Sequence, residues 1–313
     1  MQDSPSPSAS DIQTGDWIER RVPAGIQPYF RLARVDRPIG TWLLLIPCWW
    51  GTALATASVV GPDPMHSLLF ALLFAIGAFI MRGAGCTWND ILDRDFDAKV
   101  ARTATRPIPS GAVSVRQAFM FLALQLAAAF VILLFFNLYT IVLAISSLAL
   151  VALYPLMKRI TYWPQAFLGL TFNWGALVGW SAVTGGLELP AILLYAAGVC
   201  WTLGYDTIYA HQDKEDDILI GVKSTAIKFG ENSRLWVWLF YGATVVLLAA
   251  AFWTAGLRWT AYPFLAFAAF QLARQAAQVD FDDPNDCADK FRSNRYAGFL
   301  VVAAMLAGGV PLG

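Results

Sequence analysis

The chain has 313 residues, of which 58% are hydrophobic and only 14% charged, and its mean hydropathy is +0.54. Ordinary soluble domains carry about a quarter charged residues, so this composition excludes a soluble globular protein and indicates an integral membrane protein. The 22 basic and 22 acidic residues cancel, so no overall electric field favours nucleic acid as a partner, and we expect none.

The N-terminal stretch is rich in Ser, Pro and Asp and lacks the apolar core of a secretory signal peptide. We expect residues 1–30 to form a disordered or interfacial tail and residues 31–313 to form a single transmembrane domain. The stretch also lacks the Arg-rich, acid-poor amphipathic pattern of a mitochondrial leader. This absence favours a bacterial inner membrane as the location.

Apolar runs recur along the rest of the chain, each about twenty residues long, which is enough to cross a bilayer as a helix. Breaks at Gly, Pro and charged residues predict an all-α, polytopic bundle of about nine transmembrane helices. The predicted spans are residues 39–59, 67–86, 118–136, 139–157, 164–184, 190–209, 235–255, 261–277 and 296–312.

The charges in the loops predict the orientation of these spans. Crossing nine times divides the loops into two sets, which the positive-inside rule can tell apart. The set on the N-terminal side carries nearly all of the loop Lys and Arg residues, whereas the other set carries only Arg258. We therefore expect the N-terminus in the cytoplasm, with the acidic segments at residues 90–97 and 206–217 near the same face.

The first acidic segment is NDILDRDFD, which follows the second predicted span. On a helix, Asn89, Asp93 and Asp97 lie within about 80° of one another, so one face presents an amide and two carboxylates. Like charges one turn apart repel each other. We expect a cation to lie between them.

The second acidic segment is DTIYAHQDKEDD, at the end of the sixth predicted span. If it is helical throughout, Asp206, Asp213 and Asp217 lie within about 40° of one another. Asp206 falls almost inside the apolar run, where an unpaired acid is costly, so it is a candidate functional residue.

These acidic, oxygen-donor faces suit Mg²⁺, which binds one or two carboxylates together with substrate phosphates. Soft ligands are scarce near both segments, which argues against zinc or haem. The alternative is that both segments are solvated helices of mixed charge. Their matching spacing at the same face of the membrane favours the metal-binding interpretation.

Basic residues near the acidic segments are candidates for binding the diphosphate that Mg²⁺ would accompany. Positive charge stabilises a diphosphate as its ester bond breaks. The same residues also satisfy the positive-inside rule, which is the alternative explanation. The candidates are Arg102, Arg106, Lys158, Arg159, Lys223 and Lys228.

Two polar residues lie inside predicted spans. Arg82 is about two turns before Asn89. We expect it either to bind the carboxylate of a substrate that accepts the transferred group, or to pair with Asp36 or another acid. Asn173 is expected either to orient the acceptor or to tie two helices together.

Two long segments, NDILDRDFDAKVARTATRPIPSG and DTIYAHQDKEDDILIGVKSTAIKFG, resemble the two Asp-rich motifs of the UbiA superfamily of membrane prenyltransferases. Three further segments are similar to the branch of that family that acts on 4-hydroxybenzoate in the ubiquinone pathway. They are RPIGTWLLLIP, RGAGCTWND and YPLMKRITYWPQAFLGLTFNWG. The resemblance covers residues 31–298.

The resemblance implies a UbiA-type helical bundle in the lipid bilayer, with polyprenyl diphosphate and 4-hydroxybenzoate as substrates and Mg²⁺ as cofactor. It implies that an allylic C–O bond ionises, that the ring carbon ortho to the phenol hydroxyl attacks, and that a base removes the ring proton; Asp206 and the released diphosphate are candidates for that base. The implied metal set is Asn89, Asp93, Asp97, Asp206, Asp213 and Asp217, whereas Asp90 and Asp216 point off the acidic faces. Asp93, Asp97, Asp206, Asp213 and Lys158 are the expected catalytic residues, and Arg82, Arg102, Arg106, Arg159, Asn173, Tyr209 and Lys223 are expected to bind substrates.

Other functions remain open at this point. One alternative is a prenyltransferase that acts on another aromatic acceptor. A cation-coupled transporter also uses acids at membrane depth, but the acids here gather at one face and leave a path across the bilayer without polar lining. A purely structural subunit would not need two matched acidic segments.

Overall fold

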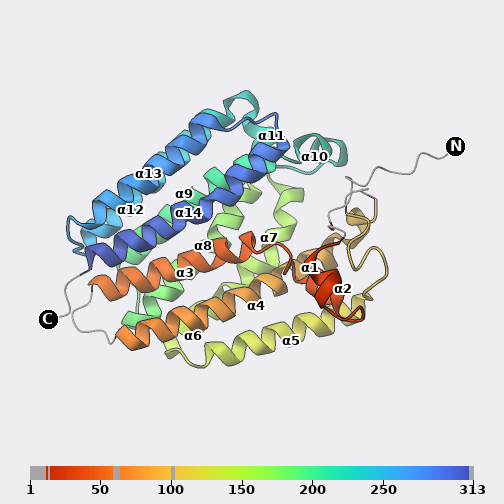
Figure 1. The fold of residues 1–313 in the computed structure, drawn as a ribbon, viewed down its shortest axis with the longest axis horizontal. Helices are drawn as coiled ribbons and strands as arrows, with labels where there is room; N and C mark the ends of the chain where they lie inside the picture. Colours follow the sequence, from red (N-terminus) through yellow and green to blue (C-terminus); the bar gives the residue numbers. More distant parts are fainter. Residues whose placement is uncertain (1–11, 13–14, 59–63, 100–102, 310–313) are drawn as a thin grey trace. The chain divides into compact units, whose positions relative to one another are not determined.

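The structure is a computed structural model, and it describes residues 12, 15–58, 64–99 and 103–309. The described residues form helices and turns without strands, which confirms the all-α prediction (Figure 1). The chain divides into two compact units. The first unit comprises Met1–Thr41 and Ile76–Leu133, and the second unit comprises Trp42–Ala75 and Leu134–Gly313.

The helices are named in chain order in Figure 1, and most are long and apolar. They are α1 (Trp17–Arg21), α2 (Gln27–Leu32), α3 (Ile39–Ser58), α4 (Pro64–Asp97), α5 (Val115–Leu133), α6 (Leu138–Ser146), α7 (Leu148–Ile160), α8 (Pro164–Thr184), α9 (Leu189–Ala210), α10 (Lys214–Ile220), α11 (Thr225–Phe229), the 3₁₀ turn η2 (Gly230–Asn232), α12 (Ser233–Thr254), α13 (Ala261–Gln278) and α14 (Pro284–Gly308).

Seven helical segments in the described part of the chain are long and apolar enough to cross a membrane. They match the first seven predicted spans, and α6 and α7 together make one of them. The eighth and ninth predicted spans correspond to α13 and α14, which are helical but more polar. The prediction of about nine spans is therefore approximate, and α14 begins at Pro284, well before the predicted residue 296.

The first unit has a small apolar core beneath the end of α4. The ring of Tyr29 in α2 packs edge-on against Phe121 in α5, with the ring centroids 5.2 Å apart. In α4, the Thr87 hydroxyl donates a hydrogen bond to Gln125 Oε1 in α5. The buried members of this core are Leu32, Ile91, Ile108, Val113 and Ala118.

The expected N-terminal tail contains two short helices in its described part. Asp16 caps α1 by accepting a hydrogen bond from the Glu19 N–H, and Ile18 is 0% exposed. Arg31 in α2 forms ion pairs with both acids, at 3.2 Å from Asp16 and 3.1 Å from Glu19. Residues 17–21 and 27–32 therefore form helices rather than the disordered tail that we allowed, whereas the interfacial alternative stays a prediction.

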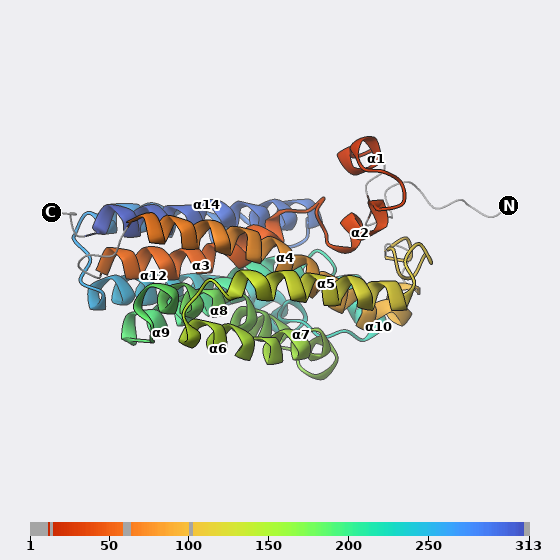
Figure 2. The same cartoon turned by 90° about the horizontal axis from the view of Figure 1, so that it is seen from below.

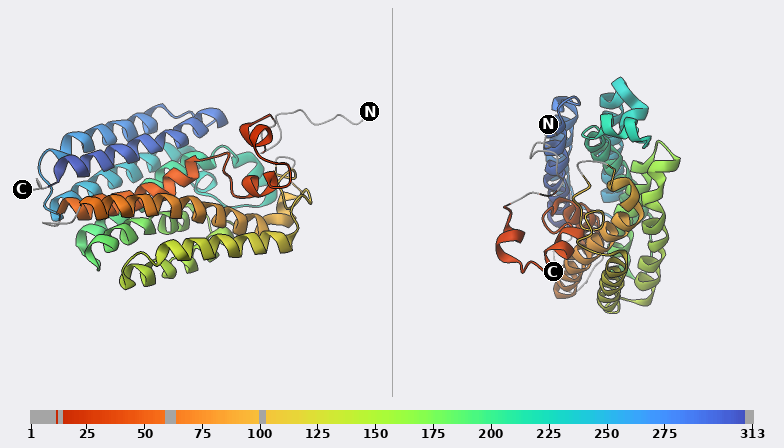
Figure 3. Two further views of the ribbon diagram at one scale, coloured as in Figure 1. Left: turned by 60° about the horizontal axis from the view of Figure 1, so that its bottom comes forward. Right: turned by 90° about the vertical axis from the view of Figure 1, so that its right-hand side faces the viewer.

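The second unit is built around α9, which packs against α8, α12 and α14. The helices α13 and α14 form an antiparallel hairpin, as Figure 3 shows, and α6 and α7 pack against α8 (Figure 2). Gly51 in α3 and Gly179 in α8 let two helices approach closely, because a β-carbon at either position would meet the backbone of the other helix.

Candidate functional site

The first acidic segment lies on the last turns of α4, which continues without a break from its apolar part to Asp97. Asn89, Asp93 and Asp97 follow one another at intervals of one helical turn and so share a face, as predicted. Asp93 is 2% exposed and Asp97 8% exposed. Two carboxylates one turn apart are thus held in a largely buried setting.

Two arginines compensate the charge of this segment. Arg106 Nη1 donates a hydrogen bond to Asp97 Oδ2 at 2.9 Å and lies 3.6 Å from Asp90 Oδ1. Arg34 Nη2 lies 3.0 and 3.1 Å from the two carboxylate oxygens of Asp90, which is 1% exposed. Arg106 was predicted as a basic residue of the site, whereas Arg34 was not; Arg102 lies outside the described residues.

The second acidic segment is not one continuous helix. α9 ends at Ala210, residues 211–213 form a turn, and α10 begins at Lys214. The prediction that Asp206, Asp213 and Asp217 share one helical face is therefore wrong for Asp206. Asp213 and Asp217 remain one turn apart, with the Asp217 N–H donating to the Asp213 carbonyl at 2.8 Å. All three side chains are half-buried.

The turn before α10 is anchored by His211. Its Nε2 lies 2.9 Å from the Ser233 hydroxyl at the start of α12, and its ring lies 4.5 Å from that of Phe281. Burial lowers the pKa of His211 to about 4, and the nearby Lys214 acts in the same direction. The imidazole is therefore neutral at pH 7 and serves as a neutral anchor for the segment.

The chain after α10 is anchored at a second place. The Thr225 N–H donates to the buried Gln165 Oε1 at 3.0 Å, and the hydroxyls of Thr207 and Thr225 lie 2.8 Å apart. The Lys223 N–H donates to the carbonyl of Lys158 at 2.9 Å. Both ends of the second acidic segment are thus tied to neighbouring helices, through neutral groups.

The remaining candidate residues of the second unit lie near this segment or within the helix core. Lys158 and Arg159 occupy the last turn of α7, where positive charge stabilises the helix terminus. Lys223 Nζ donates to the Ile160 carbonyl at 3.1 Å. Tyr209, in the last turn of α9, stacks on Phe291 of α14 with the ring centroids 4.3 Å apart.

The two polar residues within spans differ in their surroundings. Arg82 in α4 is half-buried and lies against Gly40, where a β-carbon would meet its guanidinium. Asn173 in α8 is 1% exposed, and its amide donates to the Gly169 carbonyl at 2.9 Å and to the Thr202 hydroxyl at 2.7 Å. These contacts match the helix-tying alternative for Asn173, since Thr202 belongs to α9.

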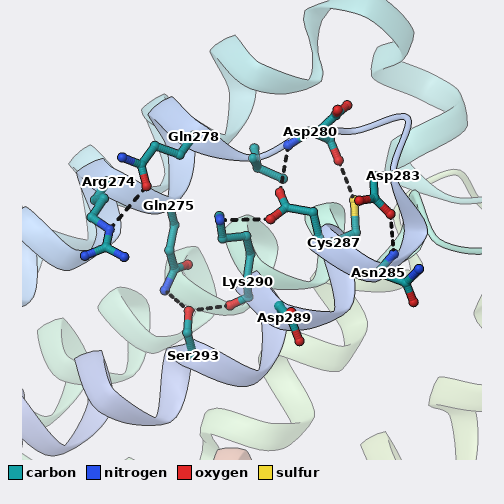
Figure 4. A network of polar contacts seen from close by, with 12 residues as sticks. Arg274, Gln275, Gln278, Asp280, Asp283, Asn285, Cys287, Asp289, Lys290 and Ser293 are labelled. Carbon is teal, nitrogen blue, oxygen red and sulfur yellow. Dashed lines mark hydrogen bonds and ion pairs between the residues drawn. The ribbon is translucent and has the colours of Figure 1, made fainter.

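A polar network joins α13 to α14 and the loop between them (Figure 4). Lys290 donates to Asp286 at 2.9 Å, and Gln275 donates to the Ser293 hydroxyl at 3.0 Å. Deeper in the unit, the buried Asn294 accepts a hydrogen bond from Trp201 of α9 at 2.9 Å and donates to Gln275 at 3.1 Å. The network positions the loop whose Phe281 ring contacts His211.

The donor atoms of both segments suit a hard cation. The part of the chain that the structure describes contains no group of three or more His, Cys, Asp or Glu side chains that could hold a metal. Each segment instead offers pairs of carboxylates one helical turn apart. This fits Mg²⁺, which uses one or two carboxylates and takes its other ligands from phosphates and water.

A family model described as "UbiA prenyltransferase family" matches residues 44–303 of the chain. The chain belongs to the UbiA prenyltransferase family. This family member is 50% identical over 298 residues to the "4-hydroxybenzoate polyprenyltransferase, mitochondrial" of Arabidopsis thaliana, covering 95% of this chain and 72% of the relative.

Solved structures share the fold of this family member. The apo structure of a UbiA homolog from Aeropyrum pernix K1 matches with a TM-score of 0.71 and 26% identity, covering 85% of this chain and 96% of that one. A UbiA homolog from Archaeoglobus fulgidus, described as bound to DMAPP and Mg²⁺, matches with a TM-score of 0.62 and 18% identity, covering 88% and 99%. The UbiA-type bundle predicted from the sequence is confirmed.

Proposed function

We propose that the chain is a Mg²⁺-dependent 4-hydroxybenzoate polyprenyltransferase of ubiquinone biosynthesis. The observation that carries this proposal is the 50% identity over 95% of the chain to a relative of that name. The two acidic segments support it, because pairs of buried or half-buried carboxylates suit a metal diphosphate substrate. The substrates are then a polyprenyl diphosphate and 4-hydroxybenzoate.

The reaction breaks the allylic C–O bond of the diphosphate and forms a C–C bond to the ring carbon ortho to the phenol hydroxyl, and the ring proton leaves. When bound, Mg²⁺ would neutralise negative charge on the departing diphosphate. Asn89, Asp93 and Asp97 would hold one ion, and Asp206, Asp213 and Asp217 would hold another. We propose that both sets serve the same diphosphate, because the reaction has a single diphosphate leaving group.

Basic side chains assist the departure of the diphosphate in this proposal. Lys158 and Lys223 are joined by a backbone hydrogen bond, so the two residues lie side by side in the second unit. Arg159 lies beside them, and Arg106, with Arg102 outside the described residues, serves the first acidic segment. Tyr209, in the last turn of α9, would contribute its ring to substrate binding.

Arg82 is proposed to bind the carboxylate of 4-hydroxybenzoate. It lies two turns before Asn89 on α4, and a half-buried guanidinium within a membrane helix requires an anion nearby. The carboxylate lies para to the phenol hydroxyl, so binding it by Arg82 would orient the ring carbons that flank the hydroxyl. Asn173 would support the site indirectly, by holding α8 against α9.

The distribution of loop charges supports placing the N-terminus and both acidic segments on the cytoplasmic side of the membrane or its equivalent. The bacterial inner membrane, expected from the N-terminal residues, has no support from relatives that are named mitochondrial. We therefore propose only the side of the membrane: the N-terminus and both acidic segments lie on the side that carries the loop Lys and Arg residues.

The proposal is tested by incubating membranes that contain the full chain with 4-hydroxybenzoate, a polyprenyl diphosphate and Mg²⁺, and by measuring the prenylated acid by mass spectrometry. We expect product with Mg²⁺ and none after chelation with EDTA, with activity restored by added Mg²⁺. Other phenolic acids serve as competing acceptors. Preferential prenylation of another acceptor would replace the substrate assignment, and full turnover without divalent ions would contradict the metal mechanism.

A further inference from the structure

We propose that Arg34 and Asp90 are positioning residues that set how strongly the first acidic segment holds its divalent cation. They do so by dividing Arg106 between two carboxylates, those of Asp90 and Asp97. The proposal rests on the proposed function, because it concerns the same cation. It assigns a role to one residue outside both acidic segments and to an acid that points away from the metal-binding face.

The four side chains form one continuous charge network in the first unit. Arg34 binds both oxygens of Asp90 at 3.0 and 3.1 Å. Arg106 Nη1 is 3.6 Å from Asp90 Oδ1 and 2.9 Å from Asp97 Oδ2. Arg106 Nη1 thus lies near both Asp90 and Asp97. A change in its attraction to the Asp90 carboxylate therefore alters how strongly it binds the Asp97 carboxylate.

Burial makes these contacts strong enough to matter. The Asp90 side chain is 1% exposed, and those of Arg34 and Arg106 are 11% and 14% exposed. Charges removed from water interact more strongly than surface pairs, and an imbalance among them is not screened by solvent. Within these printed contacts, the two arginines carry two positive charges and the two aspartates two negative charges.

The backbone at Arg34 argues that its side chain is there for this contact. Arg34 has φ of 55°, in the left-handed region, just beyond the end of α2. The Val35 N–H donates to the Phe30 carbonyl at 3.1 Å, which closes the helix in a way that usually employs glycine at the left-handed position. The turn alone would therefore favour glycine over arginine, whereas the guanidinium on Asp90 accounts for arginine.

Substituting Asp90 and substituting Arg34 should change the affinity for the cation in opposite directions. In Asp90→Asn, Arg106 loses the pull of the Asp90 carboxylate and is held more strongly by Asp97, which leaves less negative charge for a cation. In Arg34→Gln, Asp90 loses its bidentate partner and draws Arg106 away from Asp97. More negative charge on Asp97 is then available to a cation. The double variant restores the balance of charge and should lie near wild type.

The test measures binding of Mn²⁺ to the purified full chain by electron paramagnetic resonance, with and without inorganic diphosphate and without either organic substrate. We expect Asp90→Asn to raise the Mn²⁺ dissociation constant about fivefold and Arg34→Gln to lower it by a similar factor. Arg34→Lys and the double variant should stay within about twofold of wild type. Arg292→Gln, which removes an exposed pair with Asp289, is the matched control and should change nothing.

Shifts of the same sign in both single variants, or unchanged binding in both, would overturn the proposal, because a purely structural pair predicts no opposite change in metal affinity. Thermal melting identifies a variant that fails to fold. If a single variant fails to fold, the double variant decides the proposal, and it must bind Mn²⁺ like wild type. Absence of Mn²⁺ binding to wild type with diphosphate would also overturn it. Opposite shifts in a protein that does not prenylate 4-hydroxybenzoate would uphold this inference and reject the substrate assignment.

Discussion

The two acidic segments of this family member have different local structures. The first lies on one unbroken helix, with carboxylates that are nearly fully buried and held by arginines. The second is divided by a turn, its carboxylates are half-buried, and its anchors are hydroxyls, an amide and a neutral imidazole. The first segment therefore depends on charge balance, and the second depends on the neutral contacts that hold its ends.

The largest expected effect comes from removing one carboxylate from each segment. Asp93→Asn and Asp213→Asn should each lower kcat/KM about 10³-fold, because each removes a ligand of a cation that stabilises the departing diphosphate. The double variant should be little worse than the worse single variant if both segments serve one diphosphate. Steady-state kinetics at saturating Mg²⁺ measure all three.

The exposed Asp289→Asn is the control for this series, since its side chain is 72% exposed and lies outside both segments. Asparagine keeps the shape of aspartate, so folding should survive. Activity within a few-fold of wild type in either single variant would refute the shared site. Fully additive losses would indicate that the segments act in separate steps.

A smaller effect is expected from the polar residues within spans, one near each segment. Arg82→Ala should raise the KM for 4-hydroxybenzoate about 10- to 100-fold with little change in the KM for the prenyl diphosphate, because it removes a partner of the acceptor carboxylate. Equal changes in both KM values for Arg82→Ala would contradict its role in acceptor binding.

Asn173→Ala should instead lower the melting temperature by several degrees, since it breaks a buried hydrogen bond worth about 1–3 kcal/mol.

The anchoring of the second segment is tested at Gln165. Gln165→Ala removes the acceptor for the buried Thr225 N–H, and we expect kcat to fall about tenfold as the segment loses a fixed end. Gln117→Ala is a matched control, because Gln117 accepts a similar backbone hydrogen bond at the exposed start of α5. Loss of activity to the same extent in both variants would show a general defect.

The last expected effect is on stability rather than on activity, through the pH dependence that His211 gives to folding. The folded pKa of about 4 lies below the unfolded value of about 6.5, so only the unfolded state takes up a proton between these pH values. The contribution of His211 is fully present above pH 6.5 and is lost as the pH falls toward 4, by at most about 3 kcal/mol. Melting temperatures at pH 7 and pH 5 should differ less in His211→Asn than in wild type.

The sequence predicted the first segment well and the second only in part. Residues 89–97 lie on one helix in both the prediction and the structure, because no helix-breaking signal separates the apolar run from the acids. The turn that separates α9 from α10 was missed, since the His-Gln-Asp sequence at residues 211–213 contains neither Gly nor Pro. The pair Arg34 and Asp90 was also missed, because 56 residues separate them and only tertiary structure brings them together.

The polar start of α14 explains why hydropathy alone placed this helix incorrectly. Residues 284–295 are charged and amidic, so a transfer scale begins the span only where the apolar residues begin. The helix nevertheless starts at Pro284, capped by Asp283. Local capping chemistry and tertiary partners override the hydropathy signal here.

The same helix also has a consequence for membrane insertion. The apolar part of α14, residues 296–308, is about 20 Å long, which is shorter than the hydrocarbon thickness of about 30 Å. Including the turn that carries Asn294 lengthens it to about 27 Å, and Asn294 is fully buried with Trp201 and Gln275 as partners. Hydrogen bonds to α9 and α13 satisfy this polar side chain, so we expect α14 to insert stably only when those two helices are in place.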